Sequence, residues 1–306
     1  LSRSALHKNI RFLKRSVGRN VLFTSVVKGN AYGHGLDVFI RLAEDCGVRS
    51  FAVFSADEAQ TVLRSRTRKS EIMIMGSLDG TSLEWAIDNG ISFYVFDEGR
   101  LTSAREAARR VGRPARIHLE LETGMNRLGF EQDEFEKVVE IVTAEPSLFS
   151  LDGVCTHYAG AESVSNYLRI QKQIECFHQR AEWLEARGVK PKRRHTACSA
   201  AVLAYPETIM DMVRVGIAQY GYWPSKEIEM QVALQRRASG IKRRTDPLKR
   251  IISWKSRVMA VKKVEPGEFV GYGTSYLANE RMTIAVVPVG YSTGFTRSLS
   301  NAGRVL

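Results

Sequence analysis

Up to Pro224, short β-branched and aromatic runs alternate with longer stretches in which apolar residues recur at helical spacing among charged ones. The runs that predict strands are 21–27, 50–54, 71–75, 91–95, 115–121, 151–156, 193–196 and 212–215. The stretches that predict helices are 4–17, 36–46, 55–66, 80–89, 97–111, 131–144 and 164–187. Such regular alternation is typical of parallel sheets, and eight strands of this kind predict an α/β fold, a (β/α)8 barrel.

The pattern changes beyond Pro224, where strand-like runs follow one another with few helices between them. These runs are 253–264, 268–273 and 282–290. The predicted organisation is a barrel over 1–224, a basic linker over 225–250 and a mainly β domain over 251–306. The chain begins at Leu1 rather than at a methionine, and its β-runs barely suffice to close a core. We therefore expect a missing natural start and an incomplete β-domain.

A net charge of +12 raises the question of a nucleic-acid partner. Residues 236–250 hold seven of the 45 basic residues, with Asp246 as the one acid and no aromatic residue. Because no stacking aromatics interleave with these charges, we interpret the stretch as a solvated linker and expect no nucleic-acid partner. No apolar run approaches the roughly 20 residues that a membrane helix needs, so we expect no membrane association.

The cysteines and histidines show no metal-binding spacing. The four cysteines form no C-x-x-C pair, and the six histidines form no H-x-x-x-H pattern. We therefore expect no metal site. Free thiols are typical of a reducing compartment, which predicts a cytoplasmic protein.

The first strand ends on a lysine, Lys28, that is followed by a glycine-rich turn. A lysine at the mouth of an apolar strand loses hydration, so its pKa falls and its amine can form a Schiff base with a carbonyl group. The alternative is a lysine that extends its ammonium group into water. Tyr32 lies four residues further on, where its hydroxyl group could reach an anion beside this lysine.

Other unusual polar residues also fall at the ends of predicted strands. They are Arg127 beyond the fifth strand, His157 at the sixth, Ser199 after the seventh, and Arg214 and Gly216 at the eighth. In a barrel these ends share one face, and the loops after the seventh and eighth strands usually bind phosphate. The pattern predicts a phosphorylated ligand beside Lys28.

Seven strings, in order, resemble the alanine racemase family. They are VVKGNAYGHG (26–35), TGMNRLGF (123–130), THYAGAE (156–162), HTACSAA (195–201), VRVGIAQYG (213–221), VGYGTSY (270–276) and VPVGYSTGF (287–295). The resemblance implies a pyridoxal phosphate (PLP) enzyme that interconverts L- and D-alanine for cell-wall precursors. It also implies a barrel, a C-terminal β-domain, and homodimers in which each barrel site is completed by the β-domain of the partner.

The resemblance assigns roles position by position. Lys28 would hold PLP and serve as one catalytic base, and Tyr272 of the partner subunit would be the base on the opposite face. Arg214 would face the pyridine nitrogen, and His157 would hydrogen-bond Arg214. The remaining cofactor ligands would be Tyr32, Ser199 and the backbone of Gly216 and Ile217.

Two further positions, Arg127 and Tyr291, would contact the substrate or line its entrance. Arg127 matches the family's arginine near the substrate carboxylate. Where the family often has a carbamylated lysine that orients this arginine, this chain has Glu120. We expect Glu120 to pair with Arg127 instead. Cys198 and Thr293 replace the family's usual asparagine and aspartate.

Three rival functions share parts of this pattern. A broad-specificity amino-acid racemase would keep the same machinery. A fold-related PLP decarboxylase would carry a carboxylate where Arg214 stands. A non-catalytic PLP-binding barrel protein would lack both the β-domain and the Gly-Tyr-Gly string around Tyr272. Taken singly, Arg127, His157 and Tyr272 could also be ordinary structural residues.

Overall fold

The computed structural model describes residues 1–240 and 245–304. Eight parallel strands form one sheet in the order β7-β6-β5-β4-β3-β2-β1-β8. They are β1 Leu22–Val26, β2 Ser50–Val53, β3 Glu71–Ile74, β4 Ser92–Val95, β5 Ala115–Glu120, β6 Phe149–Cys155, β7 Arg194–His195 and β8 Met212–Val215. The Arg214 N–H donates to the Ala197 carbonyl at 2.9 Å and closes the sheet between β7 and β8. The predicted α/β barrel, with all eight strands, is confirmed.

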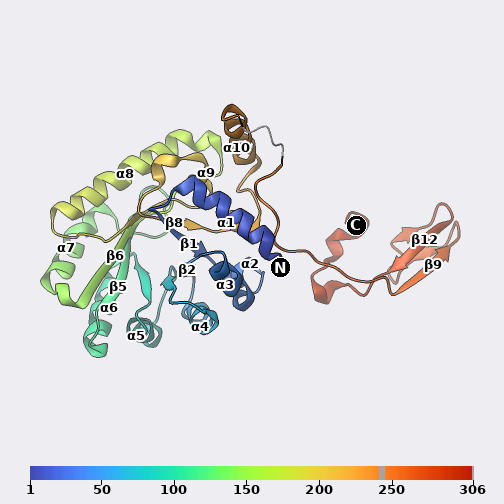
Figure 1. Cartoon of the computed structure of the whole chain (residues 1–306). Coiled ribbons are helices and arrows are strands. Elements are labelled where there is room, and N and C mark those ends of the chain that lie inside the picture. The colour runs from blue at the N-terminus through green and yellow to red at the C-terminus, as the bar shows by residue number, and fades with distance from the viewer. Residues whose placement is uncertain (241–244, 305–306) are drawn as a thin grey trace. The chain divides into compact units, whose positions relative to one another are not determined.

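Helices lie outside these strands (Figure 1). They are α1 Arg3–Val17, α3 Leu36–Asp45, α4 Ala56–Ser65, α5 Gly80–Asp88, α6 Glu98–Val111, α7 Phe135–Ala144 and α8 Tyr167–Ala186. Several begin where a serine or aspartate side chain accepts the backbone N–H three residues on, which satisfies a donor of the first turn. These capping residues are Ser2, Ser55, Asp79 and Asp97. All seven predicted helices are therefore present.

Alternation along the strands separates the barrel interior from the layer beneath the helices. Ala52 lies in the inner cluster, whereas its neighbours Phe51 and Val53 pack in the outer one. The inner cluster consists of Val26, Ala52, Met73, Tyr94, Cys155 and Met212. A filled interior leaves the strand ends as the place where side chains meet ligands.

The sequence patterns missed three helices. They are α2 Lys28–Tyr32, α9 Ser199–Ala204 and α10 Lys226–Ala238. The helix α10 occupies half of the predicted linker, because Ile228 and Val232 are buried and Ser225 caps the first turn. It belongs to a compact first unit that runs from Leu1 to Ile252. Residues 241–244 of the predicted linker lie outside the described residues.

The second unit, Ser253–Leu306, contains two antiparallel strand pairs. They are β9 Ala260–Val264 with β12 Met282–Val286, and β10 Phe269–Val270 with β11 Tyr276–Leu277. The strands are shorter than predicted, because the β9–β12 ladder ends where Ala260 pairs with Val286. Across the described residues of both units, no helix is long and apolar enough to cross a membrane.

Candidate functional site

The residues after Lys28 form a short left-handed turn. Gly29, Asn30 and Ala31 have φ of 63°, 53° and 54°, and Tyr32 also has φ of 54°. Left-handed backbone at non-glycine residues is costly and persists only where neighbours enforce it. The Glu58 carboxylate supplies that restraint, since it accepts the Gly29 N–H at 2.6 Å and the Asn30 N–H at 3.2 Å. The turn fixes the direction of the chain beside the lysine.

Lys28 borders a cavity of about 420 Å³. Gly29, Tyr32, Phe54, Ser55 and Glu58 also line this cavity. Burial lowers the pKa of the Lys28 ammonium, and the Arg127 charge lowers it further, whereas Glu58 acts in the opposite direction. The amine is therefore more easily deprotonated than an ordinary lysine, as a nucleophile or base requires.

Three predicted phosphate ligands lie together beside this turn. The Ser199 hydroxyl oxygen accepts the backbone N–H of Gly216 at 2.9 Å and that of Ala218 at 3.4 Å. A Cβ atom added at Gly216 would lie 2.4 Å from the Tyr32 hydroxyl oxygen. Only glycine at position 216 lets this hydroxyl approach the backbone so closely. Hydroxyl groups and backbone N–H groups gathered at the ends of these strands are donors of the kind that a phosphate group needs.

The Arg214 guanidinium is buried, and both of its terminal nitrogens donate hydrogen bonds. Its Nη2 donates to the Thr156 carbonyl at 2.6 Å, and its Nη1 donates to the His195 carbonyl at 2.7 Å and to the His195 ring nitrogen Nδ1. Burial disfavours its charge, yet the facing Tyr94 and other acidic groups raise the pKa of Arg214. The side chain remains a cation that can only donate hydrogen bonds.

His157 does not hydrogen-bond Arg214, so that predicted contact is wrong. Arg214 uses His195 instead, because strand β7 carries His195 to the neighbouring position beside β8. Burial, together with the charges of Arg214, Arg127 and Lys28, lowers the pKa of His157 to about 3. His157 therefore lies among these cations as a neutral ring.

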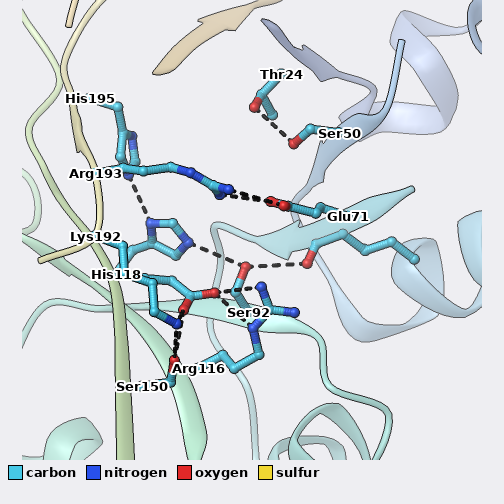
Figure 2. Close-up of polar contacts among 12 residues, drawn as sticks. Thr24, Ser50, Glu71, Ser92, Arg116, His118, Ser150, Lys192, Arg193 and His195 are labelled. Atoms are coloured by element: carbon cyan, nitrogen blue, oxygen red, sulfur yellow. Dashed lines mark hydrogen bonds and ion pairs between the residues drawn. The ribbon is translucent and has the colours of Figure 1, made fainter. Parts of the chain in front are cut away.

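A series of hydrogen bonds leads from Arg214 into the barrel interior, and Figure 2 shows its part from His195 through His118 to Ser92. His195 Nε2 lies 2.8 Å from His118 Nδ1, His118 Nε2 lies 3.3 Å from the Ser92 hydroxyl, and Ser92 donates to the Ile72 carbonyl at 3.3 Å. Arg214 can only donate to His195 Nδ1, so His195 must donate to His118, and His118 to Ser92. Burial lowers the pKa of both rings, to about 3 for His118. A single arrangement of protons therefore satisfies every hydrogen bond from Arg214 to the Ile72 carbonyl.

This series of hydrogen bonds was not predicted from the sequence, although one residue, Gly153, gave a signal for it. Gly153 lies on β6 opposite His118, between the two strands that carry the histidines. A Cβ atom at Gly153 would lie 2.4 Å from His118 Nδ1 and 2.9 Å from His195 Nε2. A glycine inside a barrel strand, flanked by histidines on both neighbouring strands, indicates such a close approach.

We expect Gly153→Ala to destabilise the protein by about 1–3 kcal/mol, because the added methyl group must displace the paired histidines. Thermal unfolding followed by circular dichroism measures this change. Gly80→Ala, at the start of α5 where a Cβ atom meets nothing within 4 Å, is the matched control and should not destabilise. Equal melting temperatures for both variants would show that the histidine pair is loosely packed.

The predicted pairing of Glu120 with Arg127 is absent. Within residues 1–240 and 245–304, the Glu120 carboxylate takes part in no hydrogen bond or ion pair. Burial raises the pKa of Glu120, although Arg214 and Arg127 oppose the shift. The Arg127 loop is held instead by Glu122, which accepts the backbone N–H of Met125 at 2.6 Å and that of Arg127 at 3.3 Å. Glu122 therefore restrains the backbone of this loop, two residues along from Glu120.

Tyr272 and Tyr291 belong to the second unit. The Tyr272 ring is fully exposed in that unit, and Gly271 before it has φ of 83°. Tyr291 begins a short 3-10 helix and is also exposed. Both rings are therefore available to another surface. In the described residues, no group of three or more histidine, cysteine, aspartate or glutamate side chains could hold a metal ion.

The chain matches two family models, the N-terminal domain of alanine racemase over residues 1–224 and its C-terminal domain over residues 251–306. The alanine racemase of Desulforamulus reducens is 35% identical over 305 residues, which are 99% of this chain and 78% of that protein. The solved alanine racemase of Streptomyces lavendulae has a TM-score of 0.85 and 30% identity, covering 99% of this chain and 76% of that one. The alanine racemase of Bartonella henselae, solved with covalently bound pyridoxal phosphate, has a TM-score of 0.77 and 22% identity, covering 98% and 77%.

Proposed function

This chain belongs to the alanine racemase family, and from that premise we propose which of its residues carry the reaction. The activity is an isomerisation that interconverts L-alanine and D-alanine. Pyridoxal phosphate, when bound, withdraws electrons from the substrate and makes its Cα proton acidic. The protein must then hold the cofactor, orient the substrate and move one proton between two faces.

We propose that the turn after β1 and the loops after β7 and β8 bind PLP. The residues that would hold it are Lys28, Tyr32, His157, Ser199, Arg214, Gly216 and Ile217. The observation that carries this assignment is the close approach of Tyr32 to Gly216, which gathers hydroxyl and backbone donors where a Cβ atom would intrude. Lys28 lies on the same turn as Tyr32, so its amine and the phosphate donors share one rigid segment.

Proton transfer needs a base on each face of the substrate Cα. Lys28 supplies one, and its lowered pKa makes the amine easier to deprotonate. Tyr272 of the partner subunit supplies the other. Arg127 lies close enough to Lys28 to lower its pKa, which supports a role for its guanidinium in binding the substrate carboxylate. Tyr291 would border the substrate entrance.

Arg214 would face the pyridine nitrogen of the cofactor. As a permanent donor it keeps that nitrogen free of a proton, which limits electron withdrawal and with it transamination, the competing reaction. The hydrogen bonds that join His195, His118 and Ser92 would orient this guanidinium from the barrel interior. His195 and His118 thus act as positioning residues.

We expect His195→Leu to lower kcat by up to about 10²-fold, because Arg214 loses its ring acceptor and shifts. His195→Asn keeps an acceptor near the same place and should restore part of the loss. The ratio of pyruvate release to racemisation should rise in the leucine variant, as transamination competes better. If both variants lose activity only in proportion to a lower Tm, with an unchanged product ratio, the role of His195 is structural.

We further propose a homodimer in the cytoplasm. The second unit exposes Tyr272 and the apolar side chains of Val261 and Phe269, and exposed large apolar side chains are typical of an interaction surface. A partner barrel would cover it and receive Tyr272.

The decisive experiment is a racemase assay on the purified chain loaded with PLP. Each pure enantiomer of alanine, serine and glutamate would be supplied, and optical rotation followed over time. We expect conversion of both alanine enantiomers and much slower conversion of the larger amino acids. Comparable rates on all substrates would instead identify a broad-specificity racemase, and cofactor binding without turnover would identify a PLP-binding barrel protein.

A further inference from the structure

A second cavity, of about 680 Å³, opens at the start of β1, the opposite end of the strand from Lys28. Its walls are α1, the first residues of β1 and the segment that follows α3. Its volume falls within the range of small-molecule sites, roughly 300–1,000 Å³. The floor is apolar, formed by Ile10, Val21, Leu22 and Phe23.

The walls of this cavity are basic and contain no acidic residue. The charged or titratable side chains that line it are His7, Arg11, Lys14, Arg15, Arg19, Cys46 and Arg49. Five of them, the four arginines and Lys14, carry the positive charge of this cavity. Like charges gathered around a concave surface create a positive potential that attracts anions.

Within the described residues these cations find only neutral partners. Lys14 Nζ donates to the Gly47 carbonyl at 2.7 Å, and Arg49 donates to the carbonyls of Glu44 and Val48. Arg15 and Arg19 form no hydrogen bond or ion pair there. The adjacent carboxylate of Asp45 pairs with Arg3 instead.

The pKa of Lys14 reflects its burial and the repulsion among these cations. Burial lowers the pKa of its ammonium, and the Arg49 charge lowers it further. An anion in the cavity would relieve both effects. An arginine guanidinium can donate two parallel hydrogen bonds to two oxygens of one phosphate group. The apolar floor suits an uncharged, flat or aliphatic group.

We propose that this cavity binds an organic polyphosphate of the nucleoside diphosphate type, with its phosphates among Arg15, Arg19 and Arg49 and its organic part on the floor. A single phosphate would leave most of the five cations unneutralised. An extended nucleic acid does not suit the site, because the surface is concave and Phe23 is the one phenyl ring in its lining, whereas a single strand stacks successive bases on several aromatic rings. The proposal is independent of the racemase activity.

The test uses the PLP-loaded protein, so that phosphate ligands cannot occupy the cofactor site. Isothermal titration calorimetry at constant ionic strength, with EDTA present, compares the affinities of three probes. ADP is the complete ligand, pyrophosphate represents its phosphates, and adenosine represents its organic part. We expect ADP to bind most tightly, pyrophosphate more weakly and adenosine not measurably. Equal affinity for pyrophosphate and ADP would overturn the organic part of the proposal.

The double variant Arg15→Gln/Arg19→Gln should weaken ADP binding by at least about tenfold, through the loss of two charge-assisted contacts. Neither side chain has a hydrogen-bond or ion-pair partner among residues 1–240 and 245–304, so we expect the double variant to fold like the parent. The control Arg41→Gln/Arg64→Gln removes the same charge from exposed positions on α3 and α4 and should bind ADP like the parent. Equal weakening in both pairs, or tighter binding of a short oligonucleotide than of ADP, would overturn the site.

Discussion

Replacing Lys28 by alanine is expected to abolish racemisation, with a loss of at least about 10³-fold, because the change removes a base and the covalent anchor of the cofactor together. The left-handed turn should survive, since Glu58 holds it through the backbone N–H groups of Gly29 and Asn30 rather than through the lysine side chain. The variant should therefore fold and retain the noncovalent phosphate donors.

Borohydride treatment of the PLP-loaded parent should attach the cofactor to the peptide that contains Lys28, as mass spectrometry would show. The Lys28→Ala protein should take up no covalent label. Lys69→Ala, at an exposed position, is the matched control and should label and racemise like the parent. Labelling of a different lysine in the parent would remove Lys28 from the centre of the mechanism.

The second large effect is expected from Tyr272→Phe, which should abolish racemisation while leaving cofactor binding intact. The phenol is fully exposed in its own unit, so the loss of its hydroxyl group should cost little stability. Lys28 would still exchange the Cα proton on its own face. In D2O, the variant should incorporate deuterium into one enantiomer of alanine without inverting it, which proton NMR and chiral chromatography measure together.

Mixing the two inactive variants tests whether the sites are shared. In a symmetric dimer, random exchange makes about half of the dimers mixed, and each mixed dimer holds one intact site of two. Activity should therefore return to about a quarter of the parent value. No recovery, despite subunit exchange demonstrated by native mass spectrometry, would mean that Lys28 and Tyr272 act within one chain.

The local pattern of the sequence was sufficient for the barrel. Continuous apolar runs such as 51–54 and helical spacing in stretches such as 97–111 reflect burial within one element, and no distant residue is needed to recognise them. The same logic placed Lys28 and Arg214 at strand ends. Helix α10 was missed because its few buried positions, Ile228 and Val232, are too sparse to outweigh a basic composition.

Individual contacts were decided by the tertiary structure. Glu120 and Glu122 are both carboxylates near Arg127, yet only Glu122 lies where the loop turns back and presents its N–H groups. His157 and His195 both follow or end strands near Arg214, yet only His195 comes within hydrogen-bonding distance. Within each pair, the two side chains differ in their distance from the arginine. The spacing of residues along the sequence does not reveal that difference.

The sequence by itself therefore determined the fold, the end of the barrel that carries the chemistry and the residue types available there. Only the tertiary structure decided which polar groups meet, as in the chain from Arg214 to Ser92. It also brought together the five cations around the start of β1, from segments that lie up to 38 positions apart, between Arg11 and Arg49. The physical reason is the distance over which each property is set. The periodicity of buried positions arises within one helix or strand and can be read from the sequence. Hydrogen bonds and charge neutralisation depend on distances between different elements, and only packing sets those distances.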